Sequence, residues 1–240
     1  MRYSIDAHTH TIASGHAFNT ITEMAKAAAE KNLSMLGITE HTESMPGSCH
    51  RIYFTNLKVI DKEMFGVELL MGAELNIIGY DGKVDLPSWI IKDLDITVAS
   101  IHGLCMGVGT KENNTAAIVN AIKNPLINII GHPDDGTFPM DYLAIAKAAK
   151  EYDTLLEVNN SSLSSDTFRP NAYENYLELL LHCKNLGVPI IIDSDAHFSS
   201  KVGNHDHADK VIEAVDFPQE LIMNYYPEKF KKHILKYKNK

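Results

Sequence analysis

Pairs of potential metal ligands, each separated by a single residue, occur near both ends of this sequence. His8 and His10 form one pair, and Asp195 and His197 form another. Alternate residues of an extended segment point to the same side, so the two members of each pair can bind one ion together. A lone buried histidine is more often a core residue than a ligand, so the interpretation depends on how many further candidates the chain carries.

Further candidates are numerous, because the chain contains 12 histidines in 240 residues. So many unpaired imidazoles at one place would be costly to bury, and metal coordination is the simplest way to satisfy them. A mixture of imidazoles with a few carboxylates favours Zn²⁺, Fe²⁺ or Mn²⁺ over Mg²⁺ or Ca²⁺. The donors suffice for three ions if one carboxylate bridges two of them. The candidate ligands are His8, His10, His16, His41, Glu74, His102, His132, Asp195 and His197.

Two or three divalent ions at one site favour the hydrolysis of phosphate esters. Such ions lower the pKa of a bound water, so that a metal-bound hydroxide acts as the nucleophile, and they hold the phosphoryl group during attack. Three divalent cations would outweigh the charges of Glu74 and Asp195. An anion-attracting cleft is therefore expected even though the formal net charge of the chain is −9.

Seven apolar, β-branched segments alternate with stretches of helical periodicity, a pattern that predicts repeated βα units and a parallel α/β barrel. A candidate polar residue follows or ends each segment. Because the carboxyl ends of the strands converge on one face of a parallel barrel, these distant residues are expected to become neighbours. The predicted strands are 3–7, 35–39, 69–72, 96–100, 127–131, 155–158 and 188–192.

Two helices of this barrel are predicted from apolar stripes of helical spacing. A possible capping box at Thr20 and Glu23 opens the first. The first stripe comprises Ile21, Met24, Ala25 and Ala28, and the second comprises Tyr173, Leu177, Leu180 and Leu181.

Composition limits the remaining classes of function. No Pro/Gly/Ser-rich linker divides residues 1–240, which favours a single domain, and the negative net charge disfavours a nucleic-acid-binding surface. No apolar run is long enough to span a bilayer and a charged residue comes early, so we expect a cytoplasmic enzyme. Cys49, Cys105 and Cys183 lack the spacing of a disulfide framework or a thiolate zinc site, so buried thiols are expected.

The order of the motifs resembles that of the PHP superfamily, named for polymerases and histidinol phosphatases, and most closely its YcdX-type phosphatases. The resemblance covers essentially the whole chain. It rests on DxHTHT with a following histidine, TEH, GAE, a lone histidine before a glycine, GHP, LEVNNSS, DSDAH and the segment Ala214–Pro218.

The resemblance implies a single PHP domain folded as a distorted, TIM-like (β/α)₇ barrel, with three metal ions at the C-terminal ends of its strands. It also implies a homotrimer. Asp6 and Glu40 are expected to orient imidazoles rather than to bind metal. By this resemblance, His8, His10, Glu74 and Asp195 hold the first ion; Glu74, His102 and His132 hold the second; His16, His41 and His197 hold the third.

The predicted substrate is a small phosphomonoester, and Arg169 and His50 lie in loops from which they are expected to reach its oxygens. Three alternatives stay open. Polymerase-associated relatives suggest a phosphodiesterase or 3′–5′ exonuclease, which the net charge disfavours. A histidinol phosphatase would be expected to have aspartate in place of His16. A metal-stabilised binding module without catalysis would hydrolyse neither a phosphomonoester nor a phosphodiester.

Overall fold

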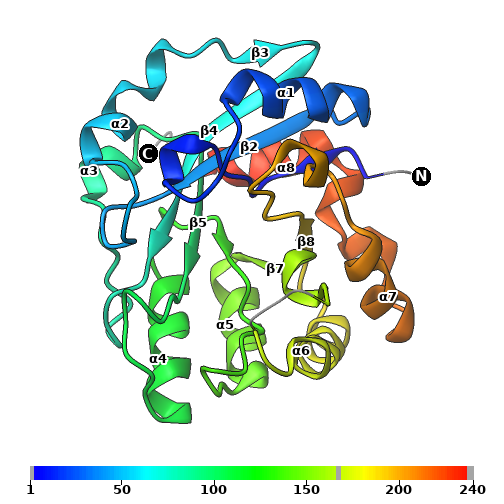
Figure 1. Ribbon diagram of the computed structural model, residues 1–240. Helices are drawn as coiled ribbons and strands as arrows, with labels where there is room; N and C mark the ends of the chain where they lie inside the picture. Colours follow the sequence, from blue (N-terminus) through cyan, green and yellow to red (C-terminus); the bar gives the residue numbers. More distant parts are fainter. Residues whose placement is uncertain (1–2, 166–168, 237–240) are drawn as a thin grey trace.

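Parallel strands alternate with helices along the chain, and the strands form one sheet that curls into a barrel (Figure 1). The computed structural model describes residues 3–165 and 169–236. Neighbouring strands follow the order β1-β2-β4-β5-β6-β7-β8, and each pair along this path is parallel. The strands are β1 Ile5–Asp6, β2 Met35–His41, β4 Val67–Asn76, β5 Ile96–Ser100, β6 Ile129–Ile130, β7 Leu155–Asn159 and β8 Ile190–Asp193. The fold is a distorted (β/α)₇ barrel, as predicted.

One additional strand was not expected from the sequence. β3, Glu63–Met64, pairs antiparallel with the start of β4. Phe65 and Gly66 form the tight turn between them, both with positive φ. The hairpin lies at the edge of the molecule and leaves the parallel order of the barrel unchanged (Figure 1).

The barrel is distorted where its first and last strands meet. Beyond the ends of β1 and β8, Thr9 and Ala196 form an isolated parallel bridge. Nearer the other end, the side-chain amide of Asn224 donates to the carbonyls of Ile5 and Ile192 at 2.9 and 2.6 Å. A buried side chain therefore supplies hydrogen bonds that a regular ladder would otherwise provide.

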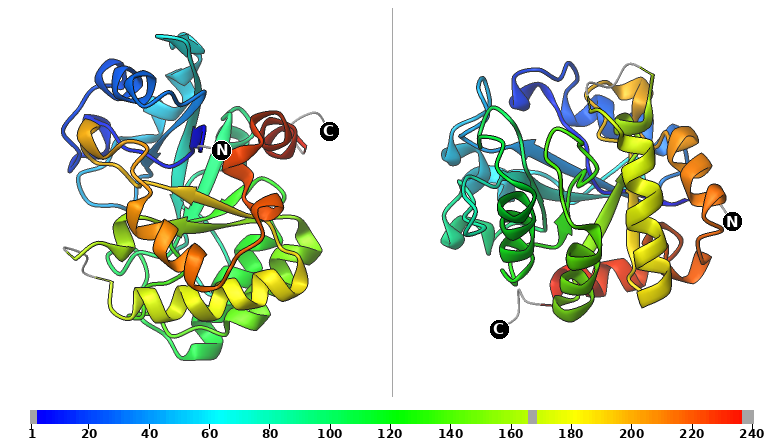
Figure 2. Two further views of the ribbon diagram at one scale, coloured as in Figure 1. Left: turned by 90° about the vertical axis from the view of Figure 1, so that its right-hand side faces the viewer. Right: turned by 90° about the horizontal axis from the view of Figure 1, so that it is seen from below.

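Alternation along the strands divides the apolar core into an inner and an outer part. On β5, Ile96 and Val98 belong to the inner cluster, whereas Ala99 belongs to the cluster shared with the surrounding helices. Phe230 and Ile234 of α8, Pro227–Leu235, complete the inner cluster at the N-terminal ends of the strands. Figure 2 shows this C-terminal helix, in red, lying against the barrel. The opposite end of the barrel remains available for polar groups.

The helices surround the barrel, and α4, α5 and α6 pack in sequence along one flank (Figures 1 and 2). The predicted capping box is present: Thr20 accepts from the Glu23 backbone amide, and Glu23 accepts from that of Thr20. No helix in residues 3–165 or 169–236 combines the length and apolar character needed to cross a membrane. The helices are α1 Ile21–Glu30, α2 Arg51–Asn56, α3 Ser88–Ile91, α4 Lys111–Ile122, α5 Tyr142–Tyr152, α6 Ala172–Leu186 and α7 Asp206–Ala214.

The apolar stripe predicted for α6 was wrong at two of its positions. Tyr173 and Leu181 are exposed. The buried face instead centres on Tyr176, whose phenolic oxygen accepts a hydrogen bond from the Asn159 backbone amide at 2.7 Å. The buried residues are Ala172, Tyr176, Leu179, Leu180 and Cys183, which follow a regular helical period. The predicted stripe placed Tyr173 on the buried face, three residues before Tyr176, and the contact with the Asn159 amide satisfies the hydroxyl of the buried tyrosine.

Candidate metal centre

The nine predicted ligands lie together at the carboxyl ends of the barrel strands. His41 ends β2 and Glu74 lies near the end of β4, and the ladder register places these two residues directly beside each other. The other seven lie in the segments that follow strands: His8, His10 and His16 after β1, His102 after β5, His132 after β6, and Asp195 and His197 after β8. Residues from the two ends of the chain thereby share one site, as the barrel geometry predicted.

The first group of donors has the geometry of a tetrahedral metal site. His8 Nε2 lies 3.1 Å from His10 Nε2 and 3.5 Å from Glu74 Oε2. Asp195 Oδ1 lies 3.7 Å from His8 Nε2 and 3.2 Å from His10 Nε2. Four ligands about 2.0–2.1 Å from a tetrahedral ion lie roughly 3.3–3.4 Å from one another. These separations therefore fit one divalent ion among the four atoms.

Glu74 faces a second group with its other carboxylate oxygen. Its Oε1 lies 2.8 Å from His132 Nε2 and 3.3 Å from His102 Nε2. The two oxygens of one buried carboxylate thus belong to two different groups of donors. Such a carboxylate could contribute one oxygen to each of two metal ions.

A third group consists of imidazole rings next to the first. The ring centroid of His16 lies 4.9 Å from that of His41 and 4.8 Å from that of His197. His10 also contacts this group, because its ligand atom lies within 4.8 Å of those of His41 and His197. The third group is looser than the first, and His10 lies between the two.

Two buried atoms of the cluster lack any hydrogen-bond partner among the described residues: His41 Nδ1 and Glu74 Oε2. They lie 2.7 Å apart. Leaving buried polar atoms unsatisfied is costly, and metal ions bound by Glu74 and by His41 would satisfy them. Together with the donor chemistry, these atoms show that the residues present fit divalent metal ions.

Glu157, on β7, contacts candidate ligands of two groups, and no role for it was predicted from the sequence. Its Oε1 contacts His8 Nδ1 at 2.7 Å, and its Oε2 accepts from the His132 backbone amide at 2.5 Å. Burial lowers the pKa of His8, but Glu157 and the nearby Glu74 and Asp195 outweigh burial and raise it well above its usual value. His8 would therefore have to give up a proton in order to hold a metal ion through Nε2.

Other polar groups fix further imidazoles through their second nitrogen. The side-chain oxygen of Asn76 contacts His102 Nδ1 at 2.8 Å. Glu40 accepts from the hydroxyl of Ser14 at 2.5 Å, and Ser14 Oγ contacts His10 Nδ1 at 3.1 Å. Glu40 thus orients an imidazole, but through a serine rather than directly. Such contacts set ring orientation and tautomer in metal sites.

Asp6 differs from its expected role, because its described hydrogen bonds go to the segment that carries Asp195 and not to an imidazole. It accepts from the backbone amide and the hydroxyl of Ser194, and from the backbone amide of Gly203. Asp195 itself adopts positive φ, a conformation that is uncommon outside glycine. Asp6 therefore stabilises the backbone turn that directs Asp195 into the site.

Burial and neighbouring charges have opposite effects on the pKa values of the two candidate carboxylate ligands, Glu74 and Asp195. Burial would raise the pKa of Glu74, yet the surrounding imidazoles, His102 first among them, hold it well below its usual range. Burial would also raise the pKa of Asp195, but His8 and other neighbours hold it well below its usual range. Burial and neighbouring imidazoles lower the pKa of His10. Both carboxylates are ionised and His10 is neutral near pH 7, which are the forms that bind metal.

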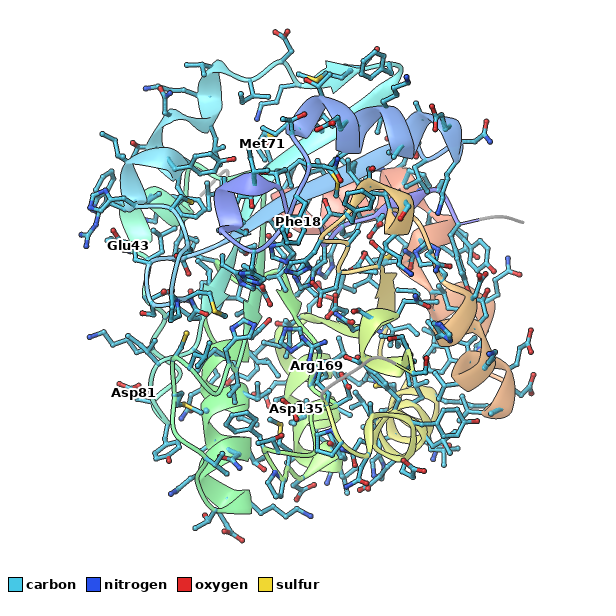
Figure 3. The ribbon with its side chains drawn as sticks, in the orientation of Figure 1. Phe18, Glu43, Met71, Asp81, Asp135 and Arg169 are labelled. Carbon is cyan, nitrogen blue, oxygen red and sulfur yellow. The ribbon has the colours of Figure 1, made fainter. Side chains whose placement is uncertain are left out.

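A cavity of about 770 Å³ opens above the cluster, lined in part by His41, His102, His132 and Asp195. Arg169, predicted to contact substrate, also lines it. The guanidinium is buried and held by Ser162 Oγ at 2.7 Å and Asp195 Oδ2 at 3.5 Å. Figure 3 shows Arg169 near Asp135, another lining residue, below the centre of the molecule.

His50, the other predicted substrate contact, does not line this cavity. Its side chain is 69% exposed, and its Nε2 lies 3.3 Å from Glu43 Oε1. Its Nδ1 accepts from the Ile52 amide, so His50 caps the start of α2. Glu43 lies at the outer edge of the molecule in Figure 3, away from Arg169. The structure therefore does not bring His50 to the site. The His50 side chain caps the N-terminus of α2 instead.

Comparison with known proteins agrees with this architecture. The PHP domain family model matches residues 6–232. The chain is 46% identical over 224 residues to a probable phosphatase of Clostridium novyi, covering 93% of this chain and 91% of that protein. It is 44% identical over 241 residues to a probable phosphatase of Thermoanaerobacter sp., covering 100% and 98% respectively.

Among solved structures, a histidinol phosphate phosphatase of Lactococcus lactis in complex with zinc, L-histidinol and phosphate is similar, with a TM-score of 0.65 and 19% identity. That comparison covers 91% of this chain and 95% of the other. A chain of an archaeal ribonuclease P with mature tRNA gives a TM-score of 0.58 at 15% identity, covering 98% and 91%. At such identities the likeness concerns the fold. The family match over most of the sequence, together with the curated relatives, shows that the chain belongs to the PHP domain family.

Proposed function

We propose that this protein is a metal-dependent phosphatase that hydrolyses small phosphomonoesters at a site for three divalent ions, with Zn²⁺ as the preferred metal. The observation that carries the proposal is the position of Glu74, whose two oxygens face two groups of imidazoles below an open cavity. The names of the curated relatives support phosphatase activity. The zinc complex of the Lactococcus lactis protein supports the choice of metal.

The donor groups suggest which residues would hold each ion. When bound, the ions would lower the pKa of a water so that hydroxide attacks at neutral pH, and would neutralise charge on the phosphoryl oxygens. His10 lies beside both the first and the third group. The proposed ligands are His8, His10, Glu74 and Asp195 for the first ion; Glu74, His102 and His132 for the second; His16, His41 and His197 for the third.

Arg169 is the side chain best placed to orient the substrate. It lines the cavity beside Asp195, and Ser162 holds its guanidinium at 2.7 Å. A fixed guanidinium can donate two parallel hydrogen bonds to phosphoryl oxygens without a large entropic cost. We assign Arg169 to phosphate binding, where it would align the phosphorus with the attacking water.

A monoester is favoured over a polynucleotide by the charge of the chain. A nucleic-acid-binding surface usually shows a basic stripe, whereas this chain has a formal net charge of −9. A monoester is also doubly charged near neutral pH, so a cluster of cations gains more from binding it than from binding a singly charged diester.

The proposal is tested with p-nitrophenyl phosphate and bis-p-nitrophenyl phosphate on metal-replete protein, before and after chelation. We expect turnover of the monoester that is lost with chelator and restored by Zn²⁺. Preference for the bis-ester would replace the proposal with a phosphodiesterase. Hydrolysis of neither by protein that retains its ions would favour a binding module. Histidinol phosphate as a third substrate tests the remaining alternative.

A further inference from the structure

Large apolar side chains stand exposed around the mouth of the metal cavity. Phe18 is 71% exposed, Leu104 is 74% exposed and Phe198 is 48% exposed, and all three line the cavity. Exposed apolar side chains that gather around one opening usually mark a binding surface. Phosphate binding alone gives no reason to place them there.

Each of these side chains comes within two residues of a proposed metal ligand. Phe18 follows His16, and Phe198 follows His197 directly. Leu104 lies two residues after His102, in the turn that follows β5. Short stretches of backbone therefore connect these three side chains to the proposed metal ligands, which limits how far they can move from the metal site.

The two phenylalanines are also held to each other through their backbones. The Phe18 amide donates to the carbonyl of His197 at 3.0 Å. The side-chain oxygen of Asn19 accepts from the Ser199 amide at 2.8 Å. The segments after β1 and β8 thus form one connected part of the rim. An apolar surface that is already ordered can bind a ligand without paying for loop ordering.

Polar side chains, among them Arg169, Lys201 and Asn204, line other parts of the cavity. In Figure 3, Phe18 lies above the centre of the molecule, and Arg169 lies below it. The cavity of about 770 Å³ is far larger than a phosphate ion requires. Sites of about 300–1,000 Å³ typically enclose a drug-sized ligand. The substrate should therefore carry a sizeable group beyond its phosphate.

We propose that the alcohol part of the substrate carries a flat aromatic ring, which binds at the rim formed by Phe18, Leu104 and Phe198. This inference rests on the proposed phosphatase function. Two phenylalanines favour an aromatic partner, because aromatic pairs gain from offset or edge-to-face contact beyond the area that they bury. The phosphate end would then lie at the metal cluster beside Arg169.

Matched substrate pairs test the ring without changing the reacting alcohol. One pair is 3-phenylpropyl phosphate and propyl phosphate, and the other is adenosine monophosphate and ribose 5-phosphate. Both binding to metal-replete protein, by calorimetry, and kcat/KM are measured. We expect the ring-bearing member of at least one pair to be favoured roughly tenfold, the level that stacking on an aromatic side chain typically gives. The pair that shows the larger ratio distinguishes a simple aryl group from a nucleobase.

Three variants assign the preference to the rim. Phe18→Ala and Phe198→Ala should each reduce it and leave the ringless substrates and the metal content unchanged, whereas an effect on both members of a pair would indicate a disturbed metal site. Leu104→Ala tests the third side chain of the rim and should also reduce the ring preference. Phe65→Ala is the matched control, because Phe65 is also exposed but lies in the β3–β4 turn, outside the cavity lining.

The outcomes separate the two proposals. A ring preference in binding without hydrolysis would keep the rim assignment and reject the phosphatase. Equal binding and equal kcat/KM within both pairs would keep the phosphatase and overturn the rim assignment, leaving a polar substrate such as a sugar phosphate. A ring preference that Phe18→Ala, Phe198→Ala and Leu104→Ala all leave intact would also overturn it.

Discussion

Replacing Glu157 with glutamine should weaken metal binding without removing any ligand. The carboxylate contacts His8 Nδ1 and the His132 backbone amide. Glutamine keeps one acceptor oxygen, but its NH₂ group would face the other donor, so at least one of these ligands loses its partner. Loss of a group that orients a metal-bound residue typically lowers affinity about 10–100-fold, which corresponds to about 1.4–2.7 kcal/mol.

The assay for Glu157→Gln is a titration of the metal-loaded protein with a competing chromogenic chelator, followed by thermal unfolding with and without Zn²⁺. We expect at least one ion to dissociate more easily and the metal-dependent rise in Tm to shrink, because ligand binding stabilises the folded state in proportion to its affinity. Glu178→Gln makes the same chemical change at an exposed position on α6 and should alter neither quantity. Unchanged affinity for every ion in Glu157→Gln would refute the assigned role.

Four further predictions concern individual sites. His132→Ala should remove one ion and most activity, and elemental analysis that finds the full metal content would contradict the second group of ligands. Thr20→Ala should lower the free energy of unfolding by about 1 kcal/mol with activity unchanged, as measured by urea denaturation, because it removes the N-cap of α1. Burial raises the pKa of Cys183 to about 12, so this thiol should stay protonated and resist Ellman's reagent at pH 8 until the protein unfolds. The expected homotrimer is checked by light scattering, and a monomeric mass would reject it.

The convergence of the ligands could be predicted because strand ends carry a strong sequence signal. Runs rich in apolar residues, such as Ile96–Ser100, are followed within two residues by a polar candidate, here His102, and a parallel barrel brings such ends together. The register between neighbouring strands did not have to be known to predict that these residues lie close together. His41 and Glu74 are neighbours because of the β2–β4 ladder, yet each already stood at a predicted strand end or just beyond it.

The groups that orient the ligands were harder to predict. Glu157 lies inside β7, with Leu155 in the inner cluster two residues before it, so alternation directs its carboxylate into the barrel. A charge at an inward position of a buried strand was the available signal. The hydrogen bonds that connect Glu40 to His10 through Ser14 had no such signal in the sequence, because they depend on how the loop after β1 folds back. His50 caps α2 outside the cavity lining, and the sequence does not distinguish a helix cap from a substrate contact.

The most direct test of the trinuclear phosphatase is elemental analysis of tag-free protein, with phosphomonoester hydrolysis measured on the same sample. We expect two to three equivalents of Zn, Fe or Mn per chain, with activity that follows metal content as chelator is added and Zn²⁺ is returned. Less than one equivalent, not recovered on reconstitution and accompanied by no turnover, would contradict both the ligand assignments and the proposed reaction.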